Sequence, residues 1–386
     1  MKKILPYGNH QISKQDIEAV VKVLRSDRLT TGPEINKFEE VLCKGFGAKN
    51  VNVVSNGTAA LHLAGLAMGW GPDDIILTTP MSFLATANCI VYSGSKPNFI
   101  DIDNSNYTID VNQLEDKIKN YQAGGYKIKA VIGVDYAGHP CKWEDLRFLA
   151  DKYNFQLVND NCHAMGSEYN NDKHYAVKYA DIVIQSFHPV KHITSGEGGA
   201  VITNIDEYHE KVSRLRTHGI IYTDNDIGPW YREMIELGYN YRLTDIQSAL
   251  GRSQYERLDN RIKRRQEIAK IYNEKFLFND SLITPNVATG VKHSYHLYAL
   301  QVIFSNIDID KKTLFNKMLG KGIQLQVHYI PIHLNSFYMK KYGFKHGDYP
   351  NAEKFYNHQL SLPIYPELAN EEVEYVINTL LNIIRE

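Results

Sequence analysis

Short apolar runs alternate with stretches of helical periodicity through much of the chain. The runs are rich in β-branched residues and end at turn residues, which is typical of buried strands. We expect strands at residues 51–54, 75–78, 129–134, 155–158, 182–184 and 200–203. Because helical segments separate most of them, the pattern between about residues 50 and 205 predicts a mostly parallel sheet with helices on both faces. Ligands bind such sheets at the carboxyl ends of the strands, so we expect the functional site there.

Two capping-box patterns mark helix starts outside this region. Ser13 and Asp16 have the required spacing, and the apolar positions after them predict a helix to about residue 26. Thr244 and Gln247 repeat the pattern and predict a long helix that leaves the large domain. The apolar positions of this long helix include Ile246, Leu250, Leu258 and Ile262. Another helix is expected over residues 38–46.

The pattern changes near residue 260. Residues 298–304 and 322–328 resemble strands, and apolar positions from residue 373 to 384 recur at helical spacing. This indicates a smaller α+β unit. We therefore expect a large domain at residues 13–255 and a small C-terminal domain at 256–386, with residues 1–12 contributing to the site.

Composition excludes several classes of function. The 386 residues have a formal net charge of -1, so no overall field favours nucleic acid or an anionic membrane surface. The basic run Arg261, Lys263, Arg264 and Arg265 is interpreted as one solvated side of a helix. The four cysteines form no CxxC pair, no segment approaches about 20 apolar residues, and Pro6 interrupts any apolar leader. We expect a cytoplasmic protein with reduced thiols and no metal.

A lysine on a strand-end loop is the first candidate for chemistry. Lys191 follows the expected strand 182–184 and precedes the glycine cluster Gly196, Gly198 and Gly199. A lysine amine forms a Schiff base with a carbonyl compound when its surroundings keep part of it unprotonated. An isolated lysine is more often a surface residue. His188 and His192 are four residues apart, but Pro189 between them argues against a helical metal pair.

Other strand ends carry polar or aromatic residues. Gly57 and Thr58 lie between a strand and a helix, where backbone N–H groups can hold a phosphate. Asp160 follows the strand at 155–158, where it either caps the next helix or serves the site. Phe83 follows the strand at 75–78, where it either packs in the core or stacks on a planar ligand.

Several motifs together resemble the DegT/DnrJ/EryC1/StrS family of sugar aminotransferases. The lysine motif is Ser186-Phe187-His188-Pro189-Val190-Lys191 with Gly196-Glu197-Gly198-Gly199. The other motifs are Leu29 to Pro33, Asn56 to Leu61, Pro80 to Thr86 and Gly238 to Arg242. The resemblance implies fold type I, the aspartate aminotransferase-like α/β fold, with pyridoxal 5′-phosphate (PLP) as cofactor. Dehydratase relatives carry His in place of the lysine, so Lys191 favours amino transfer.

The resemblance assigns a role to each cofactor residue. Lys191 would be the catalytic residue and hold PLP covalently, and Asp160 would keep the pyridine nitrogen protonated, which makes the ring an electron sink. His163 would lie near the phenolic oxygen, where many relatives have Gln. Asn240 would reach the phosphate of the neighbouring subunit, which implies a homodimer with shared sites. The remaining residues would stack on PLP or hold its phosphate: Phe83, Gly57, Thr58 and Ser186.

Within the family, the likeness is strongest to members that aminate a UDP-linked 4-keto sugar in pseudaminic acid biosynthesis, with L-glutamate as donor. It rests on residues 134–138, 163–169, 187–191 and 326–332. The alternatives are another nucleotide-linked keto sugar, a dehydratase, or a PLP-binding regulator that binds DNA. The residues implied for the sugar site are Tyr7, Asp27, Arg28, Leu29, Thr30, Gln326, Val327, His328 and Tyr329.

Overall fold

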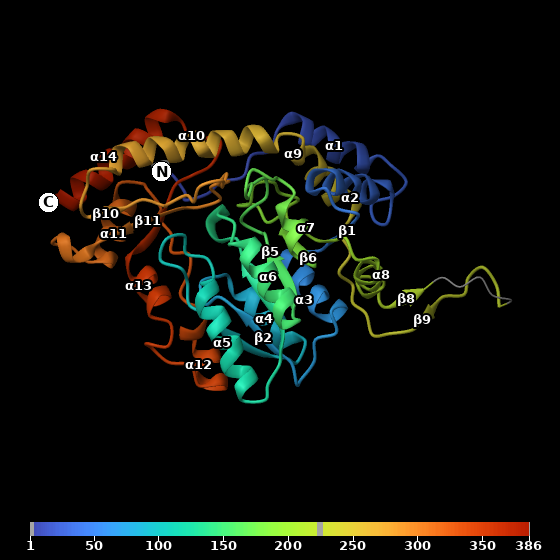
Figure 1. The fold of residues 1–386 in the computed structure, drawn as a ribbon. Coiled ribbons are helices and arrows are strands. Elements are labelled where there is room, and N and C mark those ends of the chain that lie inside the picture. Colours follow the sequence, from blue (N-terminus) through green and yellow to red (C-terminus); the bar gives the residue numbers. More distant parts are fainter. Residues whose placement is uncertain (1–3, 222–226, 386) are drawn as a thin grey trace.

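A seven-stranded sheet forms the centre of the computed structural model, which describes residues 4–221 and 227–385 (Figure 1). The strand order is β1-β7-β6-β5-β4-β2-β3. β7 is antiparallel to both of its neighbours and the remaining pairs are parallel, which confirms the predicted mostly parallel sheet. The strands are β1 (Asn50–Val54), β2 (Ile75–Thr78), β3 (Lys96–Phe99), β4 (Ile128–Val134), β5 (Gln156–Asp160), β6 (Ile182–Ser186) and β7 (Gly199–Thr203). The apolar pattern does not predict β3, because this edge strand carries Pro97 and Asn98.

Helices cover both faces of this sheet. Successive strand residues point to opposite faces, so Val183 lies in one core cluster and Ile184 in another. The first cluster contains side chains of α2 (Pro33–Phe46), α5 (Val111–Ala123), α6 (Trp143–Tyr153) and α7 (Tyr175–Tyr179). The second contains side chains of α3 (Gly57–Ala67), α4 (Leu84–Tyr92) and α8 (Asp206–Leu215). This arrangement buries both faces and leaves the carboxyl ends of the parallel strands to form the site.

Both predicted capping boxes are present. Ser13 and Asp16 cap α1 (Lys14–Leu24), and Thr244 and Gln247 cap α9 (Asp245–Tyr255). Two predicted boundaries are wrong. α2 begins at Pro33 rather than near residue 38, because proline is accommodated in the first helical turn. The expected long helix is two helices, since Arg257 leaves helical geometry before α10 (Leu258–Phe276) and its guanidinium binds Asp16.

A second core lies in the C-terminal part of the chain. The antiparallel sheet β10-β11-β12 packs with the C-terminal helices, and the predicted last helix is confirmed. Residues 322–328 do not form the predicted strand. They make only the isolated bridges Leu5 to Ile323 and Gln326 to Ser361. The elements are β10 (Leu282–Ile283), β11 (Tyr298–Val302), β12 (Gln359–Leu362), α11 (Lys311–Gly320) and α14 (Asn370–Arg385). Across the described residues, no helix combines the length and apolar character needed to cross a membrane.

The basic run on α10 is not wholly solvated, contrary to the prediction. Arg261 and Arg265 are 6% and 2% exposed. Each guanidinium donates to backbone carbonyls: Arg261 to His192, and Arg265 to His296 and Ile364. These bonds connect α10 to the loop after Lys191 and to the C-terminal part of the chain. Periodicity could not reveal them, because their acceptors are backbone groups far away in sequence.

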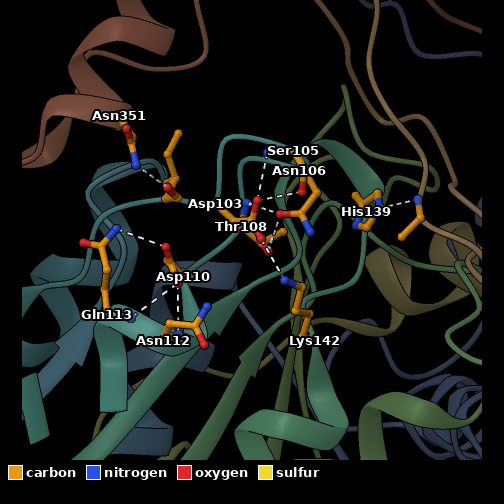
Figure 2. A network of polar contacts seen from close by, with 12 residues as sticks. Asp103, Ser105, Asn106, Thr108, Asp110, Asn112, Gln113, His139, Lys142 and Asn351 are labelled. Atoms are coloured by element: carbon orange, nitrogen blue, oxygen red, sulfur yellow. Dashed lines mark hydrogen bonds and ion pairs between the residues drawn. The ribbon is translucent and has the colours of Figure 1, made fainter. Parts of the chain in front are cut away.

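The C-terminal helices α12 (Ser336–Tyr342) and α13 (Pro350–His358) pack back onto the large sheet. Tyr107 of the loop after β3 stacks on Phe355 of α13, with ring centroids 4.0 Å apart. Figure 2 shows the polar network on this side, in which Asn351 donates to the backbone carbonyl of Ile102 and Lys142 binds Asp103. The predicted division into residues 13–255 and 256–386 stays a prediction.

Candidate active site

A cavity of about 770 Å³ opens at the carboxyl ends of the parallel strands. Its lining includes the last residue of β4, β5 and β6, which are Val134, Asp160 and Ser186. The cavity therefore lies where the parallel topology predicts it. Among the predicted cofactor residues, it is lined by Gly57, Thr58, Phe83, Asp160, His163, Ser186 and Lys191.

One wall of the cavity is formed by the N-terminus of helix α3. Asn56 caps α3 by accepting a hydrogen bond of 2.8 Å from the Ala59 amide. Gly57 and Thr58 follow at the first turn, where backbone N–H groups lack intrahelical partners and the helix dipole favours an anion. A Cβ atom on Gly57 would lie 2.9 Å from Cβ of Ser186, so glycine permits the close approach of these two walls. The Ser186 hydroxyl lines the same space.

Asp160 is held in a fixed orientation at the end of β5. Thr86 donates a hydrogen bond of 2.7 Å to Oδ2, and the Cys162 amide donates one of 3.3 Å to Oδ1. The side chain lines the cavity although the residue is 6% exposed. A carboxylate held in this way can accept a hydrogen bond from a protonated ring nitrogen.

The loop that carries Lys191 is closed at its base. The Phe187 amide donates to the Gly198 carbonyl at 2.8 Å, and the Lys191 amide donates to the His188 carbonyl at 2.9 Å. Arg261 holds the carbonyl of His192 from α10 at 3.4 Å. Burial lowers the pKa of the Lys191 amine, and this effect outweighs the opposing influence of Cys162 and Asp160. A larger fraction of the amine is therefore unprotonated at neutral pH.

His163 and Tyr329 also line the cavity and lie against each other. His163 Nε2 lies 3.1 Å from the Tyr329 hydroxyl, and His163 Nδ1 accepts a hydrogen bond from the Ala137 amide at 3.3 Å. Burial, with a contribution from Lys191, lowers the pKa of His163 well below its ordinary value. Phe83 is 55% exposed and lines the cavity, with its ring centroid 5.9 Å from that of Tyr329.

The predicted sugar-site residues are only partly brought together. Tyr7, His328 and Tyr329 line the cavity, and the rings of Tyr7 and His328 are 5.0 Å apart. Residues 27–30 are exposed on the loop between α1 and α2 and do not line it. Gln326 and Val327 are also outside its lining, although they immediately precede His328.

Asn240 lies apart from the cavity of its own chain. It is exposed at the base of a hairpin formed by β8 (Ile220–Ile221) and β9 (Glu233–Met234), where it pairs with Thr217. This hairpin extends away from the rest of the molecule (Figure 1). Its position is compatible with a role at a neighbouring subunit and not with a role in the same chain's cavity.

Sequence reasoning missed several lining residues. Thr86 belongs to a recognised motif, but only its contact with Asp160 gives it a role. His296 lies on a segment with no strand-end signal, and its ring centroid is 4.4 Å from that of His163. Asn56 was predictable, since Asn before a helix is a common N-cap. The rings of His62, Tyr92 and Tyr241 lie together in the lining of the cavity, and no local pattern brings them together.

Comparison with known proteins agrees with this geometry. The sequence model of the DegT/DnrJ/EryC1/StrS aminotransferase family matches residues 10–381. The chain belongs to this family. The aminotransferase is 39% identical over 383 residues to a Campylobacter jejuni protein named UDP-4-amino-4,6-dideoxy-N-acetyl-beta-L-altrosamine transaminase, covering 99% of this chain and 98% of the relative.

Solved structures show the same fold. The structure of Helicobacter pylori PseC, an aminotransferase of pseudoaminic acid biosynthesis, matches with a TM-score of 0.91 at 34% identity, covering 99% of this chain and all of the other. The PLP form of a putative sugar aminotransferase, Spr1654 from Streptococcus pneumoniae, matches with a TM-score of 0.88 at 26% identity over 99% of each chain. The aminotransferase thus has fold type I, a large mostly parallel sheet with a smaller C-terminal α+β part, and is a PLP-dependent sugar transaminase.

The groups that line the cavity of the aminotransferase are suited to bind PLP. It combines the open helix terminus at Gly57 for a phosphate, the oriented carboxylate of Asp160 for a ring nitrogen, the exposed ring of Phe83 for stacking, and the half-buried amine of Lys191. These four groups come from different elements and share one cavity. A nucleotide sugar and an amino donor are the substrates expected for a transaminase of this family.

Proposed function

We propose that the protein transfers the amino group of L-glutamate to C4 of UDP-4-keto-6-deoxy-N-acetyl-β-L-altrosamine. The products are UDP-4-amino-4,6-dideoxy-N-acetyl-β-L-altrosamine and 2-oxoglutarate, in pseudaminic acid biosynthesis. The observation that carries this proposal is the full-length similarity to relatives named for that product, at 39%, 39% and 35% identity. The expected cytoplasmic location stays a prediction.

Lys191 is the proposed covalent anchor of PLP and the group that moves the proton. When bound, PLP supplies an electron sink that makes the α-proton of the amino donor acidic. Once the donor displaces the amine, Lys191 Nζ is free to accept this proton and return it elsewhere. The lowered pKa of the Lys191 amine suits this exchange, because a fully protonated amine could neither attach nor accept a proton.

Asp160 and the helix terminus of α3 are proposed to hold the two ends of PLP. The carboxylate of Asp160 faces the cavity with its orientation set by Thr86 and the Cys162 amide, and it would keep the ring nitrogen protonated. Gly57, Thr58 and Ser186 would bind the phosphate. Phe83 would cover one face of the ring.

The substrate end of the cavity is proposed to be completed by a second copy of the chain. Lys191 is the one lysine or arginine among the residues that line the described cavity, yet a UDP-sugar and glutamate are both anionic. Residues 27–30, including Arg28, are exposed outside it. We propose a homodimer in which Asn240 reaches the partner's phosphate site. The exposed apolar residues of the hairpin support burial at an interface: Trp230 is 70% exposed, Met234 62% and Leu237 74%.

Two other functions are less well supported. A family dehydratase would lack the lysine that stands at position 191. A PLP-binding regulator of DNA would need a basic surface, whereas the chain has a net charge of -1 and half of its one basic run is buried. The remaining alternative is an aminotransferase that acts on another nucleotide-linked keto sugar. The decisive experiment must distinguish this substrate from the proposed UDP-linked 4-keto sugar.

The experiment follows labelled nitrogen. Purified protein with PLP receives ¹⁵N-glutamate and the UDP-linked 4-keto sugar, and mass spectrometry measures label in the nucleotide sugar. Label in the UDP-sugar supports the proposal. If glutamate gives 2-oxoglutarate but label enters only a dTDP- or GDP-linked keto sugar, the chemistry is right and the substrate wrong. If glutamate is not converted and a gel shift shows salt-sensitive DNA binding, the protein is a regulator and the proposed aminotransferase function is wrong.

A further inference from the structure

The proton position on His163 is fixed by its neighbours. The Ala137 amide donates to Nδ1 at 3.3 Å, and a backbone N–H can only donate. Nδ1 therefore carries a lone pair. The ring is 5% exposed, and burial lowers its pKa so far that the imidazole is neutral near pH 7. A neutral imidazole has one proton, which consequently resides on Nε2.

This tautomer determines the direction of the next hydrogen bond. Nε2 lies 3.1 Å from the hydroxyl of Tyr329, so the imidazole donates and the tyrosine oxygen accepts. The hydroxyl hydrogen of Tyr329 is then directed away from His163. No other hydrogen bond of this hydroxyl occurs within the described part of the chain. Burial raises the pKa of Tyr329, so the hydroxyl keeps its proton at neutral pH.

Tyr329 is held beside the place expected for the cofactor ring. Its ring lies 5.9 Å from that of Phe83 and 6.1 Å from that of His163, and all three line the cavity. The preceding carbonyl of His328 accepts a hydrogen bond from the Tyr136 hydroxyl, and the Tyr329 amide donates to Met81 Sδ at 3.4 Å. These contacts hold the backbone at Tyr329, and its hydroxyl has one proton to donate into the cavity.

We propose that Tyr329, rather than His163, donates the hydrogen bond to the phenolic oxygen of PLP, and that His163 is the positioning residue that sets the direction of this bond. The inference rests on the proposed cofactor site and makes it specific. The imidazole of His163 accepts from the Ala137 amide and donates to Tyr329 at the same time.

A donor at this oxygen has a spectroscopic consequence. A hydrogen bond withdraws electron density from the oxygen, which then holds the neighbouring proton of bound PLP less tightly. Removal of the donor should raise the pH midpoint of the visible band by about one unit, a tenfold change in proton affinity. The other titratable groups that face Tyr329 stay in place in such a variant: Tyr7, Tyr136, Asp160, Cys162, Lys191 and His328.

The test is a pH titration of the visible band in PLP-loaded Tyr329→Phe without substrates. We expect a midpoint about one unit above that of the unchanged protein. Tyr92→Phe is the matched control, since Tyr92 also lines the cavity. The pH midpoint of the visible band in this variant should equal that of the unchanged protein. A Tyr329→Phe midpoint within about 0.2 units of the unchanged protein would overturn the inference, whereas an unchanged protein that forms no visible band would overturn the proposed function instead.

A second measurement reads the tautomer without cofactor. In protein labelled with ¹⁵N-histidine, His163→Gln identifies the two ring resonances by their loss. We expect an unprotonated Nδ1 and a protonated Nε2 in the unchanged protein. The opposite tautomer would leave Tyr329 as the donor toward His163 and contradict the inference even if Tyr329→Phe folds poorly.

Discussion

Thr86 donates a hydrogen bond of 2.7 Å to the carboxylate of Asp160, although 74 residues separate them in sequence. Because the one proton of Thr86 is committed to the carboxylate, the Ser82 hydroxyl, 2.7 Å away, must donate to Thr86. All three residues are buried. The chain of donors fixes Oδ2 of Asp160, while the Cys162 amide fixes Oδ1.

Loss of the Thr86 hydroxyl should weaken catalysis more than folding. Thr86→Val keeps the shape of the side chain and removes the bond to Asp160, so we expect kcat to fall about tenfold, as for one charge-assisted hydrogen bond. Thr86→Ser should restore most of the activity, because it keeps the hydroxyl. Steady-state kinetics with thermal melts measures both effects. A Thr86→Val enzyme with unchanged kcat would show that Asp160 needs no orientation from this residue.

Removal of the Lys191 amine should abolish both attachment and turnover. With Lys191→Ala, borohydride reduction should add no cofactor mass to the chain, and turnover should fall by more than about a thousandfold, since no other amine lines the cavity among the described residues. Lys142→Ala is the control, because Lys142 pairs with Asp103 away from the site. Cofactor mass retained on the Lys191→Ala protein would rule out the assigned anchor.

A side chain at position 57 should disturb the phosphate site. In Gly57→Ala the new Cβ would lie 2.9 Å from Cβ of Ser186 and beside the amides of the α3 terminus. We expect PLP to bind about tenfold more weakly in equilibrium dialysis. Gly71→Ala is a matched control, since nothing lies within 4 Å of its Cβ position. Equal affinities for the two variants would place the phosphate elsewhere.

The sequence predicts those parts of the fold and site that depend on local signals. Capping boxes at Ser13 and Thr244, and the strand that ends before Lys191, follow from residues close together in the chain. Contacts between distant segments are not predictable in this way. His163 and Tyr329 are 166 residues apart, and the guanidinium of Arg265 is buried by carbonyls that no periodicity reveals. Residues 322–328 show that a local apolar pattern can also predict a strand that is absent, because they form only isolated bridges.

The ion pair of Asp16 with Arg257 should stabilise the fold in a pH-dependent way. Burial alone would raise the pKa of Asp16, but hydrogen bonds from Arg257, Ser13 and Ser253 outweigh it and lower the pKa to about 2. Because the folded pKa lies below the value of 3.8 in the unfolded chain, the ionised Asp16 stabilises the fold at pH values above about 4. This stability is lost as the pH falls toward 2. At pH 7, Asp16→Asn should lower the free energy of unfolding by roughly 1–2 kcal/mol after allowance for solvent screening.

Urea unfolding at a series of pH values checks this expectation. The difference between the unchanged protein and Asp16→Asn should shrink as pH drops below about 4, because the carboxylate becomes protonated. Asp206→Asn is the control, since its ion pair with Lys49 is largely exposed and should contribute little to stability at any pH. A constant difference across the pH range would show that Asp16 acts through shape and not through charge.

Shared sites would allow two inactive variants to complement each other. Lys191→Ala removes the anchor from a chain, whereas Asn240→Ala leaves that chain's anchor intact and removes the residue proposed to reach its partner. In a mixed dimer, the site with a normal Lys191 receives a normal Asn240 from the other chain, so one of its two sites is complete.

Equal mixing after reversible dissociation should therefore recover about a quarter of normal activity, because half of the dimers are mixed and each has one complete site. Light scattering must show dimers for both variants, and unmixed variants provide the baseline. Trp230→Ser on the extended hairpin should reduce the recovery by weakening association, since the indole is 70% exposed in the single chain. Stable mixed dimers without recovered activity would show that Asn240 serves its own chain or no site at all.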